Sequence, residues 1–192
     1  IDDEPTRKPV TVVLARRGER WHLVDDRPLP GTDTTTWRGP WDFGPLEVRA
    51  VETGAGNRSL VVGHPEHSSL VADIAAELAS AVEAVDAVWG TGWPRRALVL
   101  VTASHDEFTA QVGSRYNGAD IAAVAVSDVV DHERGRATGQ RIVFSPAAEQ
   151  RLDEAGLRAI LRHELTHVAA RTDTVDGSPL WILEGYADYV GY

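Results

Sequence analysis

The stretch RHELTHVAAR, residues 162–171, places two histidines four positions apart, with a glutamate directly after the first. At about 100° per residue, positions four apart share one side of an α-helix, so the imidazoles of His163 and His167 can reach one point. Apolar residues recur on the neighbouring side, at Leu157, Leu161, Leu165 and Val168. Asp153 is an acceptable N-cap just before them. The pattern predicts a half-buried helix with a histidine pair along its edge.

Glu164 falls between the two histidines and the apolar side of this helix. Its side chain therefore lies close to any metal that the histidines hold, but it leaves the helix in a different direction from the two imidazoles. This position suits a base that acts on a water molecule beside the metal, and it does not force Glu164 into the ligand set.

A second helix is predicted in SPLWILEGYADYVGY, residues 178–192, where Ser178 suits the N-cap and Pro179 the first turn. Glu184 and Asp188 lie four apart and share one side of it. A catalytic zinc site needs a third protein ligand and a position left open to water. Glu184 is the candidate ligand. Asp188 can accept a hydrogen bond from the far nitrogen of a ligating histidine and fix its orientation.

The composition narrows the classes of function. The 192 residues allow one good core with a small attached unit, and a net charge of -10 without a Lys/Arg-rich run argues against a nucleic-acid binder. No apolar stretch approaches the roughly 20 residues that span a bilayer. Without cysteine, a metal must be held by His, Asp or Glu. The lack of methionine suggests a mature or excised piece and, with the lack of cysteine, favours an extracytoplasmic location.

The order of elements predicts an α+β fold. Short strand-like runs separated by Gly, Pro and Asp fill residues 9–63, and a long helix is expected from Ser69 to about Trp89. Strands at 96–102, 119–127 and 140–145 follow, with a helix capped by Ser104 between the first two. We expect a small, mostly antiparallel sheet packed on the two C-terminal helices. The expected boundary lies near 64–68, between a strand-rich N-terminal segment, 1–65, and a core, 66–192.

HELTH (163–167), followed after a short loop by WILEGYADY (181–189), resembles the gluzincin metallopeptidases, the thermolysin-like clan. The resemblance implies one catalytic Zn²⁺ bound by His163, His167 and Glu184. It implies that Glu164 is the general base for a metal-activated water, and that Asp188 supports a ligand from behind. The activity implied is hydrolysis of peptide bonds in peptides or proteins.

Two further features follow from the same resemblance. In the clan, an extended substrate pairs with an edge strand next to the active-site helices, and QRIVFSP (140–146) occupies the matching place in the sequence. Gluzincins also continue into a helical subdomain that often supplies a Tyr or His donor to the oxyanion. Because the sequence stops at Tyr192, four residues after Asp188, we expect a core without that subdomain. Tyr186 and Tyr189 are the substitutes proposed for this donor, with Tyr116 and His132 as further options.

Two other functions remain open from the sequence. The first is a catalytically inactive module that keeps zinc for structure and presents the cleft to a partner. The second is a zinc hydrolase that cleaves an amide in a non-peptide substrate. Glu164→Gln should leave the properties of an inactive module unchanged, whereas it should abolish cleavage by a peptidase. A mixture of unstructured peptides tests the second alternative, because a hydrolase of non-peptide amides should cleave none of them.

Overall fold

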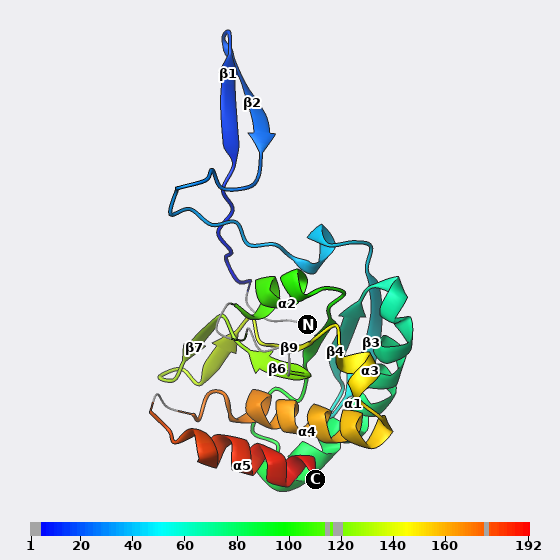
Figure 1. The fold of residues 1–192 in the computed structure, drawn as a ribbon. Helices are drawn as coiled ribbons and strands as arrows, with labels where there is room; N and C mark the ends of the chain where they lie inside the picture. Colours follow the sequence, from blue (N-terminus) through cyan, green and yellow to red (C-terminus); the bar gives the residue numbers. More distant parts are fainter. Residues whose placement is uncertain (1–4, 114–115, 117–120, 175–176) are drawn as a thin grey trace.

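The structure is a computed structural model that describes residues 5–113, 116, 121–174 and 177–192. An α+β body carries a two-stranded hairpin, β1 (Val13–Arg17) and β2 (Arg20–Asp25), which projects from it (Figure 1). The predicted α+β class and the strand-rich N-terminal segment are confirmed. Among the described residues, no helix combines the length and the apolar character needed to cross a membrane.

A five-stranded mixed sheet forms the centre of the body. Its order is β3 (Glu47–Thr53), β4 (Asn57–Gly63), β5 (Leu98–Val101), β9 (Arg141–Phe144) and β6 (Ala123–Val126). The two inner pairs, β4 with β5 and β5 with β9, are parallel, and the two outer pairs are antiparallel. The prediction that residues 140–146 form the edge strand is wrong. β9 lies inside the sheet, whereas β6, which among the described strands pairs with β9 alone, is one of the two edge strands, with β3 at the other edge.

Helices cover both faces of this sheet (Figure 1). Helices α1 (Ser68–Trp89) and α4 (Glu154–Ala170) pack on one face, and α5 (Leu180–Gly191) packs against α4. Their apolar sides meet the odd-numbered side chains of β4 and β5 in the main core. Helix α2 (His105–Val112) covers the other face through Phe108. The short α3 (Ala148–Arg151) leads into α4.

Side-chain caps set where two of these helices begin. The side chain of Asp153 accepts a hydrogen bond from the Gly156 amide at the start of α4, as its position predicted. Ser104 accepts one from the Glu107 amide at the start of α2, also as predicted. Helix α5 differs, because Pro179 and not Ser178 occupies its N-cap position.

The expected boundary near residues 64–68 does not separate two structural units. β3 and β4 precede it in sequence, yet β4 pairs with β5 at the centre of the sheet. The body therefore begins no later than Glu47. A second small hairpin, β7 (Val129–Asp131) and β8 (Arg136–Thr138), lies between β6 and β9 in the sequence.

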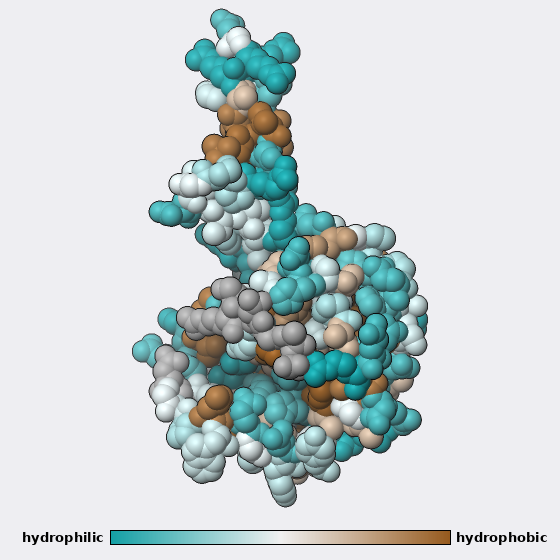
Figure 2. All heavy atoms as spheres, viewed as in Figure 1, coloured by the Kyte–Doolittle hydropathy of each residue, from teal (hydrophilic) through white to brown (hydrophobic). Residues whose placement is uncertain are grey.

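The projecting hairpin has one apolar side. Leu14 lies opposite Leu23, and Trp21 lies one pair further along on the same side, with 65% of its surface exposed. Figure 2 shows an apolar band across the hairpin, between a polar tip and a more polar base. The hairpin therefore contributes little to the core of the body.

Candidate metal centre

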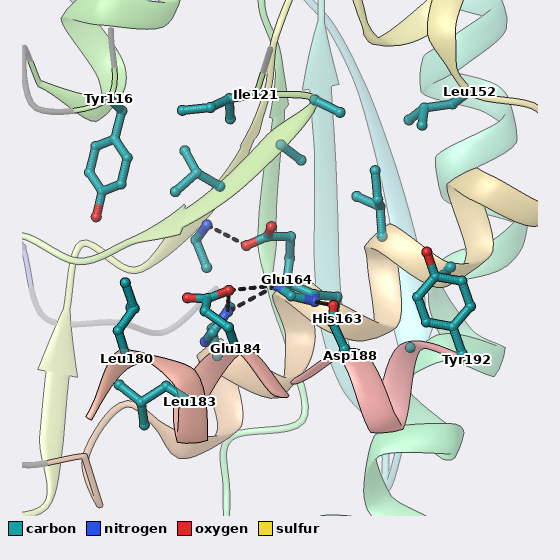
Figure 3. Close-up of a pocket in the computed structure, with 18 of the residues that line it drawn as sticks. Tyr116, Ile121, Leu152, His163, Glu164, Leu180, Leu183, Glu184, Asp188 and Tyr192 are labelled. Carbon is teal, nitrogen blue, oxygen red and sulfur yellow. Dashed lines mark hydrogen bonds and ion pairs between the residues drawn. The ribbon is translucent and has the colours of Figure 1, made fainter. Parts of the chain in front are cut away.

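The two histidines of α4 direct their rings to one point beside the helix, where Figure 3 shows His163 and Glu184 pointing toward each other. They occupy successive turns, and the Nε2 atoms of His163 and His167 lie 3.1 Å apart. Their rings are set at 74° to each other, with centroids 4.8 Å apart. The helical spacing read from the sequence is thus enough to bring both ring nitrogens together.

Glu184 reaches the same point from α5. Its Oε2 atom lies 3.3 Å from Nε2 of His163 and 3.5 Å from Nε2 of His167. Close packing of α4 and α5 makes this possible, since a Cβ added at Gly191 would lie only 3.0 Å from the backbone oxygen of Ala159. The third candidate ligand therefore depends on how the two helices meet.

The positions of these three atoms fit zinc. A tetrahedral ion with bonds of about 2.0–2.1 Å to nitrogen and oxygen holds its ligand atoms about 3.3–3.4 Å apart. The three observed separations, 3.1, 3.3 and 3.5 Å, bracket that value. Three lone-pair donors so close together repel one another unless a cation or protons lie between them. His163, His167 and Glu184 could therefore hold a divalent metal.

Asp188 orients one member of the group. Its Oδ1 atom accepts a hydrogen bond from Nδ1 of His163 at 2.9 Å. Because that nitrogen then carries the proton, a neutral His163 has its lone pair on Nε2, which points at Glu184. Burial lowers the pKa of His167, although Glu184 acts in the opposite direction. This favours the neutral imidazole, the form that binds metals.

Glu164 lies next to the group but points away from it, toward the sheet. Its side chain is 7% exposed, and its Oε2 atom accepts a hydrogen bond from the Ala125 amide of β6 at 2.7 Å. Burial raises the pKa of Glu164 to about 7, against the opposing effects of His163 and of the Ala125 hydrogen bond. A carboxyl group with this pKa can both accept and release a proton near neutral pH.

A cleft of about 690 Å³ opens above these residues, between β6 on one side and α4 and α5 on the other. Figure 3 shows Tyr116 and Tyr192 at its two ends. Tyr186 packs edge-on against Trp89, and Tyr189 is 72% exposed; neither belongs to the described wall of the cleft. The structure thus brings Tyr116 and Tyr192 to the cleft and leaves the two proposed donors outside it.

Reasoning from the sequence missed several of the described residues that line the cleft, among them Tyr192, Arg171 and Ala125. His132, one of the further options for a donor, instead hydrogen-bonds through Nδ1 to the Thr172 carbonyl, 2.9 Å away. Arg171 lines the cleft and donates from Nη2 to the Ala125 carbonyl at 2.8 Å. Because Arg171 lies four residues after His167, the sequence could have predicted that the two share one side of a helix. No pattern in the sequence indicates that Ala125 lies at the cleft.

Comparisons of this chain with protein-family models, with curated proteins and with solved structures found no match.

Proposed function

We propose that the protein is a zinc-dependent metallopeptidase that hydrolyses peptide bonds. One observation carries the proposal: three lone-pair donors with the spacing of a tetrahedral zinc site, beside a buried carboxylate whose pKa is about 7. Zinc bound at such a site polarises a carbonyl group and lowers the pKa of water toward about 7. His163, His167 and Glu184 leave a coordination position free for this chemistry.

The other residues have separate roles in the proposed reaction. Glu164 removes a proton from the attacking water through its carboxylate and then delivers that proton to the amine of the leaving product. Asp188 keeps the proton of His163 on Nδ1 and so keeps Nε2 available as a ligand atom. The walls of the cleft hold the substrate and limit the access of other water.

Edge strand β6 supports a peptide as the substrate. Together with the two residues before it, β6 borders the cleft along residues 121–125, and it pairs with β9 on its other side. An extended chain can add to such an edge by main-chain hydrogen bonds, which do not depend on its sequence. A general preference for extended, unstructured polypeptides follows from this arrangement.

The experiment uses the full chain loaded with zinc and a mixture of unstructured peptides, with products identified by mass spectrometry. We expect cleavage by the wild type and about 100- to 10,000-fold slower cleavage by Glu164→Gln, which keeps the shape of the side chain but cannot take a proton. The variant should retain about one zinc per chain.

Each alternative gives a different result in the same experiment. A zinc-loaded wild type that cleaves no peptide would contradict the peptidase proposal. Equal rates for wild type and Glu164→Gln would remove Glu164 from the reaction. Glu149→Gln serves as the matched control, because Glu149 is paired with His67 outside the cleft and should not alter cleavage.

A further inference from the structure

The residue Ala125 of edge strand β6 has both of its outward backbone groups occupied, by the side chains of Glu164 in α4 and of Arg171 at the C-cap of that helix. Its amide donates to Oε2 of Glu164 at 2.7 Å, and its carbonyl accepts from Nη2 of Arg171 at 2.8 Å. Each of these bonds has an ionisable partner, and hydrogen bonds to charged groups are the stronger kind. The active-site helix therefore already fills the pairing position at Ala125.

The register of β6 identifies which residues face the cleft. In an antiparallel pair, alternate residues direct their amide and carbonyl groups at the partner strand. Ala122 accepts a hydrogen bond from Ser145, and Val124 lies opposite Val143, so the even-numbered residues face β9. The odd-numbered residues of the strand, Ala123 and Ala125, direct theirs toward the cleft, which they line together with Ile121, two residues before the strand begins.

The available part of the edge is thus shorter than the strand. Within the described part of the chain, no hydrogen bond joins the outward groups of Ala123 to another element, whereas those of Ala125 are taken. Ala125 is also the position nearest the proposed general base, since it bonds Glu164 directly. A substrate strand can therefore pair on one side of the reacting centre, toward Ile121, and not on the other.

We propose that a peptide substrate pairs with β6 only at Ile121 and Ala123, and that Arg171 ends the pairing at Ala125. The cleft then recognises the residues on one side of the scissile bond by main-chain pairing and makes no strand contacts on the other side. This inference rests on the proposed peptidase function. Arg171 acts as a positioning residue, because it works through the Ala125 carbonyl and not on the substrate.

The position of Arg171 supports this role. It follows directly after the last residue of α4, at the C-cap, one helical turn beyond His167, and it is half-buried. From there it links the end of the active-site helix to the middle of the edge strand. A substrate that extended its pairing past Ala123 would have to break the Ala125 bonds to both Arg171 and Glu164, and burial of Glu164 makes the loss of its partner costly.

The first test needs neither metal nor substrate. Amide hydrogen exchange of the isotope-labelled, metal-free full chain is followed by NMR at Ala123 and Ala125. We expect Ala125 to exchange at least about tenfold more slowly than Ala123, and Arg171→Ala to reduce this ratio. Arg158→Ala is the matched control, since Arg158 lies on the same helix and pairs with Glu77 and Glu154. Equal exchange of the two amides in the wild type would overturn the inference.

The second test measures one-sided recognition by binding, without turnover. One probe is a tripeptide with a C-terminal hydroxamate, and the other is a tripeptide with an N-terminal mercaptoacetyl group. Their peptide-free counterparts are acetohydroxamate and mercaptoacetamide. On the zinc-loaded chain, calorimetry should show that the peptide improves binding at least about tenfold for one probe and less than about threefold for the other. Arg171→Ala should narrow this difference, and Arg158→Ala should not.

The outcomes separate the two proposals. Equal gains for both probes in the wild type would overturn the one-sided cleft even if peptides are cleaved. Failure to bind zinc would remove the proposed function, while the exchange measurement on the metal-free chain still decides the role of Ala125. Slow amide exchange at Ala125, together with an improvement in binding for only one of the two peptide probes, supports the inference.

Discussion

Nδ1 of His163 donates a hydrogen bond to Asp188 across the interface of α4 and α5, over 2.9 Å. The two residues are 25 positions apart in the chain. Their contact fixes the ring of a candidate metal ligand to the helix that carries the third candidate ligand, Glu184. The orientation of the centre and the packing of the two helices are therefore linked.

Replacement of Asp188 should weaken metal binding without removing it. Asp188→Ala leaves all three candidate ligands in place but no longer fixes the proton of His163 on Nδ1. We expect the zinc affinity to fall by about 10- to 100-fold, measured by competition with a chelator. Asp173→Ala, on an exposed carboxylate beyond α4, is the control. Unchanged affinity in Asp188→Ala would show that the hydrogen bond does not serve the metal.

Removal of a ligand should abolish stoichiometric binding. We expect about one zinc per purified wild-type chain by elemental mass spectrometry, and a large loss in His163→Ala, since two remaining protein ligands hold zinc poorly. His22→Ala changes an exposed histidine of the projecting hairpin and should leave the zinc content unchanged. Wild-type protein that stays free of zinc after reconstitution would contradict the proposed metal centre.

Two glycines of α5 should respond in opposite ways to alanine. At Gly191 an added Cβ would lie 3.0 Å from the Ala159 carbonyl, so the helices must separate, and we expect a loss of about 1–3 kcal/mol in the free energy of unfolding. At Gly185 an added Cβ meets nothing within 4 Å, so the better helix propensity of alanine should stabilise by about 0.5–1 kcal/mol. Urea unfolding of the metal-free chain measures both. If Gly191→Ala left the free energy of unfolding unchanged, the end of α5 would be able to move away from Ala159 at no cost.

Asp128 should contribute stability that depends on pH. Burial raises the pKa of this carboxyl, but hydrogen bonds from Lys8 and Arg141 outweigh burial and hold the pKa below its ordinary value. The stabilisation is therefore present above the unfolded pKa of about 3.9 and is lost as the pH falls through the lower folded value.

Asp128→Asn provides the measurement. We expect it to destabilise the protein by about 1–3 kcal/mol at neutral pH, because Lys8 and Arg141 lose a charged partner. The difference from the wild type should shrink as the pH is lowered from about 5 toward 3 in urea unfolding experiments. A difference that is independent of pH would assign the effect to shape and not to charge.

Local patterns explain why part of the molecule could be predicted. Helix α4 begins after Asp153 and ends near Arg171. It could be predicted because both its N-cap and the spacing of its apolar residues involve residues only a few positions apart. The pairing of His163 with His167 follows from the same spacing. The α+β class follows from the alternation of helical and strand-like segments.

Strand order could not be read in this way. β9 is a central strand and β6 is the edge, although both are short and apolar in sequence. The parallel neighbour of β9 is β5, which comes from a distant part of the chain, and no local pattern encodes which strand has a neighbour on both sides. Because strand pairing between distant segments is not encoded locally, the sequence also did not reveal that β3 and β4 belong to the body or that Ala125 contacts α4.

The sequence by itself determined the helix of the histidine pair, its N-cap and the presence of a second helix with Glu184 and Asp188, because these depend on residues a few positions apart. Only the tertiary structure decided that Glu184 meets the histidines, that Glu164 is buried against β6 and that Arg171 closes the edge at Ala125. Those contacts join residues 17 to 46 positions apart in the chain, and long-range packing alone sets their distances.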